Sequence, residues 1–463
     1  MHNLLSRVLQ KASLDDYISK DKKMERSLTS KDLILMGVGA VIGAGIFITP
    51  GEVAAQSAGP GIMISFLIAT LVCSTSAMCY AEFSSALPIA GSAYSYGSII
   101  YGELMGWILG WALILEYMLA VASVASGFSA YLQSFLSGFG LKIPTALSGY
   151  FDPAHGTYIN IFSVLIVLLI AAILFIGAKS STRINDIIVV IKLLIILLFL
   201  AVGFFYIKPA NWSPFLPFGM KGVLHGASLV FFAYLGFDTV SSAAAEVKNP
   251  KKSMPVGIIG TLIICTILYI LVSVVLTGMV SYKHLNVADP VSFALQVVGQ
   301  GKLAGIISLG AMAGMFTMMM MMIYSISRLI YSIGRDGLLP KFLGKVNAKH
   351  RVPTNSIVIV TIIIAIMSGF VSLDKLISLV NIGTLIAFTF ISLGIIPLRK
   401  RDDIKDQNGF KVPFYPYLPI ISALLCLLLL SQISIDTWIF ALIWYAFGLV
   451  IYFTYGVPHS HLN

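Results

Sequence analysis

Twelve long apolar stretches dominate this chain of 463 residues. A bilayer core about 30 Å thick needs roughly 20 apolar residues per helix, and a backbone in lipid has to satisfy its own hydrogen bonds. Only 11% of the residues are charged, against about 25% in an ordinary globular domain. We therefore predict an all-α integral membrane protein with spans near 32–56, 61–87, 102–137, 157–178, 184–207, 222–247, 255–281, 302–334, 354–371, 375–398, 415–434 and 437–456.

Lysine and arginine side chains cluster between these stretches. Of the 30, 22 fall in segments on the same side as the N-terminus, six fall on the opposite side, and two lie inside stretches. Cytoplasmic loops carry such an excess of positive charge, so both termini are predicted to be cytoplasmic, in a multi-pass protein of the plasma membrane. This distribution accounts for the net charge of +10 without a nucleic-acid partner.

The N-terminal segment, the cysteines and the histidines give no sign of a cofactor, metal or catalytic site. Residues 1–31 are predicted to be a cytoplasmic segment whose first 20 residues form an amphipathic helix on the membrane surface. The four cysteines all lie in apolar stretches, and the seven histidines show no metal spacing. We therefore expect no cofactor and no bound metal. The sequence shows no catalytic cluster, which favours a protein that is not an enzyme.

Glycines interrupt the first stretch. Gly37, Gly39, Gly43 and Gly45 fall within nine residues, and each weakens a helix by about 1 kcal/mol relative to alanine. Gly39 and Gly43 also form a GxxxG pattern, which is typical of close helix packing. This stretch alone leaves open both an unwound segment near Gly43 and a continuous, closely packed helix.

The sixth stretch carries a matching interruption, at Gly236 and Asp238. It lies five spans after the first, and an odd offset inverts the topology of the second half relative to the first. Paired interruptions of this kind point to the binding site of a secondary transporter. Broken helices suit a free amino acid, because half-helix N-termini attract its carboxylate and freed carbonyls accept from its ammonium group.

Three segments resemble signatures of the amino acid–polyamine–organocation superfamily. They are GVGAVIGAGIF at 37–47, FFAYLGFDTVSSAAAEVKNPKKSMP at 231–255 and SRLIYSIGRDGLLP at 327–340. The chain is most similar to bacterial members of the cationic amino acid transporter branch. The resemblance implies two inverted five-helix repeats with broken helices 1 and 6, followed by two additional helices. Alternating access would take place around a central site.

The corresponding division of the chain has three parts after the N-terminal segment. Residues 32–207 form the first repeat, 208–398 the second, and 399–463 the last two helices with the cytoplasmic C-terminus. The substrate residues that the resemblance and the interruptions imply are Ile42, Gly43, Ala44, Gly45 and Ile46 in the first span and Phe232, Ala233 and Leu235 in the sixth.

Three charged residues lie deep inside stretches, where each costs about 2.5–3.5 kcal/mol on insertion scales: Lys192, Glu116 and Asp238. By resemblance, Lys192 supplies a positive charge where related carriers hold sodium, and it exchanges a proton during transport; the alternative is a structural role. Glu116 either lines the substrate cavity or is a neutral structural acid. Asp238 either caps the interrupted sixth helix or recognises a substrate side chain.

Five consecutive methionines occupy the eighth stretch, and most of them must simply fill gaps. Met322 is predicted to form the floor of the substrate pocket, where its bulk favours small substrates. Glu82, Arg328 and Asp336, near cytoplasmic ends, either pair as an inner gate or remain solvated. The same two alternatives apply to Glu246, at the end of the sixth stretch, whereas His225 is interpreted as an interfacial residue.

The predicted function is proton-coupled import of L-amino acids by alternating access. The substrate is cationic or small and neutral, such as alanine, because two acids near the site favour the first and Met322 favours the second. An exchanger without proton coupling uses the same site and stays open, as does an amino acid sensor that transports nothing. The expected partners are the amino acid, protons and membrane lipids, and the sequence does not reveal whether a small membrane protein also binds.

Overall fold

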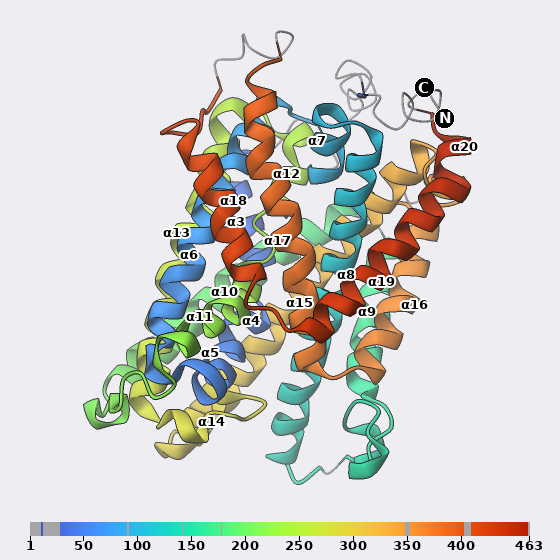
Figure 1. The fold of residues 1–463 in the computed structure, drawn as a ribbon. Helices are drawn as coiled ribbons and strands as arrows, with labels where there is room; N and C mark the ends of the chain where they lie inside the picture. Colours follow the sequence, from blue (N-terminus) through green and yellow to red (C-terminus); the bar gives the residue numbers. More distant parts are fainter. Residues whose placement is uncertain are drawn as a thin grey trace.

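The computed structural model describes residues 11–12, 28–89, 92–141, 143–176, 178–347, 352–401 and 409–461. In these ranges the chain forms helices joined by short loops, and β pairing is limited to three isolated bridges. Most of the helices run along the long axis of one bundle (Figure 1). The prediction of an all-α protein is confirmed. The predicted surface helix at 1–20 lies outside the described residues, apart from 11 and 12.

Eight segments of the described chain are long and apolar enough to cross a membrane. Three further apolar helices are shorter, with 10–17 residues. The chain is therefore a multi-pass membrane protein, while its division into twelve spans stays a prediction. The eight segments are Thr49–Ala86, Glu103–Ser137, Asn185–Phe204, Gly219–Ser242, Pro250–Met279, Gly301–Arg335, Lys375–Leu398 and Ile435–His459.

These segments correspond to the following helices. The first combines α5 (Thr49–Val53), η1 (Ala54–Ala58), η2 (Gly59–Gly61) and α6 (Ile62–Ala86). The others are α8 (Glu103–Ser137), α10 (Ala178–Phe204), α11 (Gly219–Val230) with η6 (Phe231–Tyr234) and α12 (Thr239–Ser242), α13 (Pro250–Met279), α15 (Gly301–Arg335), α17 (Leu373–Leu398), and α19 (Ile435–Ile451) with η9 (Tyr452–Gly456) and α20 (Val457–His459). The shorter helices are α9 (Ile161–Ile176), α16 (Thr354–Phe370) and α18 (Tyr417–Leu430).

The bundle has a buried centre and an apolar outer surface. In the most apolar window of α8, 94% of the residues are buried, against 28% in Asn185–Phe204 and 22% in Ile435–His459. Helix α8 packs against α15, α17 and α9. Leu194 and Leu442 are about 60% exposed on the outer helices, as expected for side chains that face lipid.

The first predicted span is broken as the glycines indicate. Helix α3 (Ser30–Val41) ends at Ile42, Gly43 takes a non-helical conformation with φ −137° and ψ −131°, and α4 (Ala44–Phe47) follows. A Cβ on Gly43 would lie 2.1 Å from Met318 Sδ. A larger residue at this position would collide with the side chain of Met318 on α15 unless that side chain moved, so glycine allows the close packing of the break against α15.

The sixth predicted span is broken as well. Helix α11 tightens into η6, Leu235 is extended, and Gly236 has φ +110°, before α12 begins at Thr239. The left-handed region suits glycine, because a Cβ there is strained. A Cβ on Gly236 would also lie 2.8 Å from Ala40 O, so this break packs directly against the end of α3.

Candidate functional site

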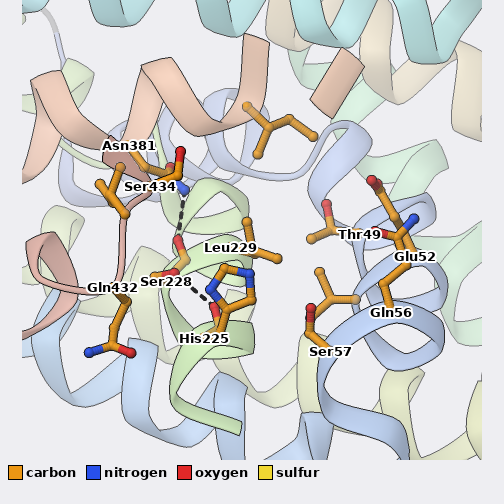
Figure 2. A pocket seen from close by; sticks show the side chains of 13 residues that line it. Thr49, Glu52, Gln56, Ser57, His225, Ser228, Leu229, Asn381, Gln432 and Ser434 are labelled. Carbon is orange, nitrogen blue, oxygen red and sulfur yellow. Dashed lines mark hydrogen bonds between the residues drawn. The ribbon is translucent and has the colours of Figure 1, made fainter. Parts of the chain in front are cut away.

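A cavity of about 410 Å³ lies roughly one helical turn beyond the two breaks. Its walls come from α5, η1, α11, α17 and the loop at 432–434 (Figure 2). Thr49 follows Gly45 by four residues, and Ser228 precedes Phe232 by four, which places the cavity beside both interruptions. His225, predicted to be merely interfacial, lines this cavity.

Lys192 on α10 places its ammonium group at the end of α3. Nζ donates to Ile42 O at 2.8 Å and to Gly39 O at 3.0 Å, and the side chain is fully buried. The break deprives this end of α3 of intrahelical donors. Since the helix dipole also favours a positive charge at a C-terminus, the ammonium group stabilises the broken end.

The surroundings of Lys192 connect three helices. A Cβ on Gly314 of α15 would lie 3.3 Å from its Cδ, and Asn185, two turns earlier on α10, is buried against Gly39. Among the residues that the structure describes, no carboxylate forms an ion pair with Lys192. Lys192 thus lies between the first and eighth predicted spans, with backbone carbonyls as its partners.

Two tyrosines that were not predicted from the sequence donate hydrogen bonds to backbone carbonyls in or near the two interrupted helices. The hydroxyl of Tyr269 on α13 donates to Ala233 O at 2.5 Å and lies 3.2 Å from Val41 O. Tyr131 on α8 donates to Phe47 O at 2.8 Å. Both side chains are fully buried. A tyrosine in an apolar stretch needs a partner for its hydroxyl, and this requirement is the sequence signal that could have identified them.

The two buried acids lie in one polar cluster beside the second break. Tyr117 donates to Asp238 Oδ2 at 2.6 Å, whereas Asp238 Oδ1 and both carboxyl oxygens of Glu116 are buried without a hydrogen-bond partner in the described structure. Glu116 and Asp238 interact electrostatically. Asp238 also stands at the N-cap position of α12, although its side chain makes no cap hydrogen bond. Glu116 and Asp238 therefore share one buried cluster with Tyr117 beside the second break.

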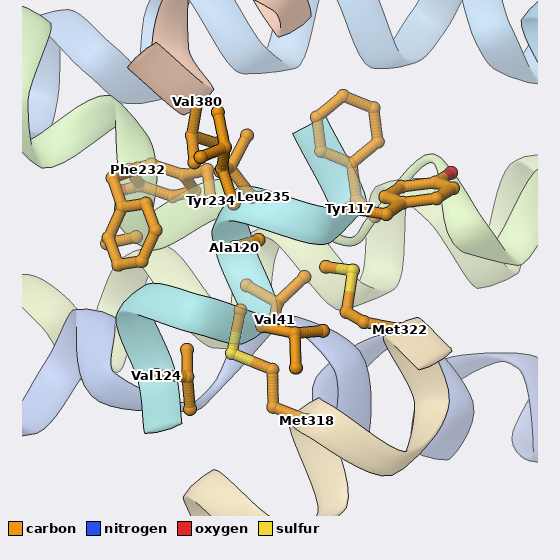
Figure 3. Packing of buried hydrophobic residues seen from close by; sticks show 14 of the residues in the cluster. Val41, Tyr117, Ala120, Val124, Phe232, Tyr234, Leu235, Met318, Met322 and Val380 are labelled. Atoms are coloured by element: carbon orange, nitrogen blue, oxygen red, sulfur yellow. The ribbon is translucent and has the colours of Figure 1, made fainter. Parts of the chain in front are cut away.

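Apolar side chains surround the breaks on the remaining sides. Val41, Phe232 and Met322 belong to one buried hydrophobic cluster with Ala120 and Val124 of α8 (Figure 3). Each is at most 1% exposed, so the predicted substrate residues are enclosed by the protein. Met322, the predicted pocket floor, lies in this cluster together with Met318, whose sulfur contacts Gly43. The predicted residues Ile42, Gly43, Ala44, Gly45, Ile46, Ala233 and Leu235 are also buried.

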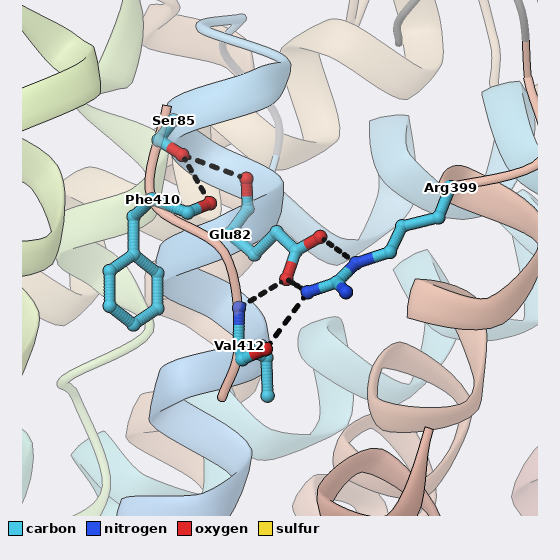
Figure 4. Close-up of polar contacts among 5 residues, drawn as sticks. All are labelled: Glu82, Ser85, Arg399, Phe410 and Val412. Carbon is cyan, nitrogen blue, oxygen red and sulfur yellow. Dashed lines mark hydrogen bonds and ion pairs between the residues drawn. The ribbon is translucent and has the colours of Figure 1, made fainter. Parts of the chain in front are cut away.

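Polar groups tie the helices together at the other end of the bundle. Arg399, which follows α17, forms a bidentate ion pair with Glu82 of α6. Its Nε lies 2.7 Å from Oε1 and its Nη2 lies 2.8 Å from Oε2, and Glu82 also accepts a hydrogen bond from Val412 N (Figure 4). This carboxylate raises the pKa of the Arg399 guanidinium above its usual value. Arg328 pairs with Glu246 at 2.8 Å, so the structure shows pairing, one of the two alternatives open for these residues. Asp336 accepts from Tyr94 at 2.9 Å.

Comparisons with known proteins define the class to which this fold and site belong. The family model described as amino acid permease matches residues 28–460. The chain is 52% identical to the methylthioribose transporter of Bacillus subtilis (strain 168), over 96% of each chain. It is 46% identical to the branched-chain amino acid permease BcaP of the same organism, over 98% of this chain and 99% of that protein. It is 29% identical to the vacuolar cationic amino acid transporter 4 of Arabidopsis thaliana, over 95% of this chain and 93% of that protein.

This protein belongs to the amino acid permease family, within the amino acid–polyamine–organocation superfamily. The resemblance drawn from the sequence is confirmed, including the similarity to bacterial permeases and cationic amino acid transporters. The reported relatives are transporters and permeases, not enzymes, and their class agrees with the eight apolar segments that are long enough to cross a membrane in the described residues.

Proposed function

We propose that this protein is a proton-coupled importer of a small apolar L-amino acid, working by alternating access. The observation that carries the proposal is the ammonium group of Lys192 on Gly39 O and Ile42 O. A single charge thereby stabilises the broken helix that lines the candidate substrate site. Gain or loss of one proton at Nζ changes the stability of that helix end directly.

The proposed topology has twelve spans and two inverted repeats, at 32–207 and 208–398, with 399–463 as the appended part. The order of helices supports it. The short α7 (Ser92–Ile100) precedes the 35-residue α8, and the short α14 (Pro290–Val297) precedes the 35-residue α15. The 22 basic residues on one side support a cytoplasmic location of both termini, with the Glu82–Arg399 pair at the cytoplasmic end of the bundle.

In the proposed site, the unwound segments bind the amino acid backbone. The carboxylate lies at the N-terminus of α4, near Gly43, Ala44 and Gly45, and the ammonium group lies at the carbonyls of the second break, around Phe232 and Ala233. Leu235, Ile42 and Ile46 complete the enclosure. Irregular backbone inside a membrane is tolerated where it lines such a cavity.

Coupling follows from the contacts of Lys192. When Nζ is protonated from the outside, it holds the end of α3 and keeps the site in the form that binds substrate. Loss of the proton to the cytoplasm removes the charge that strengthens both hydrogen bonds, so the inner half of the first span is held less firmly and the substrate leaves with the proton. Glu116 and Asp238, with three unpartnered carboxyl oxygens between them, are suited to pass the proton inward.

The side chain of the substrate meets an apolar wall. Phe232, Val41 and Met322 are apolar and fully buried, and Tyr117 already donates to one oxygen of the neighbouring Asp238. A branched or small aliphatic side chain fits this wall better than a cationic one. The 46% identity to a branched-chain amino acid permease supports the same substrate class.

A second candidate substrate is methylthioribose, named for the relative that is 52% identical. The three unpartnered carboxyl oxygens of Glu116 and Asp238 could accept from sugar hydroxyls. Met318 and Met322 would pack against its methylthio group, since thioethers adapt well to one another.

The test is uptake into proteoliposomes with an imposed inward proton gradient and no sodium. The panel contains labelled leucine, valine, alanine, arginine and methylthioribose. Leucine or valine accumulation that a protonophore collapses supports the proposal, and accumulation of methylthioribose alone selects the second candidate. Uptake only into liposomes preloaded with amino acid identifies an exchanger. Absence of flux with retained binding identifies a sensor.

A further inference from the structure

Helix α10 packs against α3, and Asn185 lies in this interface together with Lys192. Asn185 precedes Lys192 by about two turns of α10. A Cβ on Gly39 of α3 would lie 3.2 Å from Asn185 Nδ2 and 3.4 Å from its Oδ1. Gly39 is also the residue whose carbonyl accepts from Lys192 Nζ at 3.0 Å. Asn185 and Lys192 therefore act on the same point of the first span.

The side-chain oxygen of Asn185 has no hydrogen-bond partner in the described structure, although the residue is only 3% exposed. The amide group forms a side-chain hydrogen bond with the carboxylate of Asp186. An ionised carboxylate only accepts, so the amide nitrogen is the donor and Oδ1 is left over. A buried acceptor without a donor costs free energy, because it has given up its hydrogen bonds to water. The packing of α3 on α10 carries this cost, and separation of the two helices removes it by letting water reach Oδ1.

Two carboxylates oppose the same packing. Asp32 of α3 and Asp186 of α10 interact electrostatically, and both are half-buried. Asp32 accepts from Thr29 N at 2.8 Å and from Thr29 Oγ1 at 2.7 Å, and such bonds favour the charged form of a carboxyl group. Within the described residues, neither acid forms a salt bridge. Their like charges therefore repel each other across the α3–α10 interface.

Lys192 acts in the opposite direction. Its ammonium group binds two carbonyls of the first span, Gly39 O and Ile42 O, from α10. Hydrogen bonds from a charged donor are about twice as strong as neutral ones. The contact between the two helices is thus the difference between one charged attachment and two unfavourable terms. A difference of this kind changes sign when the charge on Nζ is lost.

We propose that Asn185 and the Asp32–Asp186 pair bias the inner half of the first span toward release, and that the ammonium group of Lys192 holds it in place. Asn185 is thus a positioning residue, which acts through α3 and touches no substrate. Its role accounts for a polar side chain at a buried position where an apolar one packs without this cost. The inference rests on the proposed coupling through Lys192, because it states what drives the release once the proton has left.

The test compares Asn185→Leu with Asn160→Leu in the purified full-length protein. Leucine has about the shape of asparagine but no polar atoms. Asn160 is also buried, but its Oδ1 accepts from Ser129 Oγ and from Ser163 N, so this asparagine is the matched control. The readouts are thermal unfolding, hydrogen exchange of the α3 amides, and the KM and maximal rate of leucine uptake.

A second pair of variants tests the charges. Asp186→Asn removes the repulsion with Asp32 while keeping the shape of the side chain. Asp436→Asn is its control, since Asp436 is exposed on α19. The same three readouts apply to both.

Asn185→Leu is expected to unfold at a higher temperature than the wild type and to exchange its α3 amides about tenfold more slowly, which corresponds to about 1.4 kcal/mol. Its maximal uptake rate falls several-fold while KM is not raised, because release is slowed and substrate binding is not. Asp186→Asn changes α3 exchange in the same direction, by about twofold. Asn160→Leu unfolds at a lower temperature without slower exchange at α3, and Asp436→Asn behaves as the wild type.

An unfolding temperature below that of the wild type, or α3 exchange as fast as in the wild type or faster, overturns the inference when it is found for Asn185→Leu. Either result would show that the amide stabilises the interface or has no effect on it. Unfolding and hydrogen exchange need no substrate, so this outcome is distinct from failure of the proposed function. Absence of any amino acid uptake by the wild type refutes the transport proposal, whereas slower α3 exchange in Asn185→Leu would still support the bias at the interface.

Discussion

The Cα atom of Ala233 lies 2.5 Å from the position that a Cβ on Gly45 would take. These residues belong to the two interrupted helices, 188 positions apart in the sequence. The same closeness recurs between Gly236 and Ala40 O. The two breaks therefore pack backbone against backbone, and glycine at both contacts is what allows the unwound segments to form one site.

Gly45→Ala is expected to lower amino acid uptake by more than tenfold. The new methyl group overlaps the backbone of Ala233, which has no flexible end to move, and overpacking of this kind costs about 1–3 kcal/mol. Gly305→Ala on α15 is the control, since nothing lies within 4 Å of its Cβ position. Initial uptake rates and thermal unfolding of both variants provide the comparison, and equal behaviour would show that the breaks need not touch.

Lys192→Met is expected to abolish accumulation driven by a proton gradient while some substrate binding remains. Methionine has a similar length, but it cannot donate to Ile42 O or Gly39 O. Lys302→Met, at an exposed position on α15, is the control. The measurement is uptake with and without an imposed pH gradient; a normal response to the gradient in Lys192→Met would assign the lysine a structural role only.

Tyr269→Phe is expected to destabilise the protein by about 1 kcal/mol and to reduce uptake several-fold. The variant leaves Ala233 O without its donor at the second break. Tyr417→Phe, at a position that is 70% exposed, is the matched control. Melting temperature in detergent and uptake rate are the two readouts. Unchanged values for both would mean that water replaces the hydroxyl.

Met322→Ala is expected to extend the substrate range toward longer side chains. Removing a fully buried thioether opens space in the apolar wall near Val41 (Figure 3), at a stability cost of about 2–5 kcal/mol. Competition of labelled leucine uptake by phenylalanine and methionine measures the change, with Met220→Ala as the control. An unchanged competition profile would place Met322 outside the pocket.

The sequence predicted much of what gives this protein its class. Long apolar stretches fix helices because a backbone in lipid can satisfy its hydrogen bonds only internally. Glycines in the first and sixth stretches predicted both breaks, and the structure confirms them at Gly43 and Gly236. Isolated charges in apolar surroundings identified Lys192, Glu116 and Asp238 as residues that need partners, because an unpaired charge is costly there.

The partners themselves could not be predicted. That Lys192 binds Ile42 O, that Tyr269 binds Ala233 O, and that Arg328 pairs with Glu246 depends on how helices distant in sequence cross. Hydropathy records which residues avoid water, but it carries no information on which face of one helix meets which face of another. The unpartnered oxygens of Thr49 and Asn381 likewise depend on the tertiary structure, because these two residues lie on different helices that line the same cavity. The sequence by itself determined the helices and where they break, because those follow from local hydrogen bonding and transfer energies; only the tertiary structure decided which groups complete the breaks.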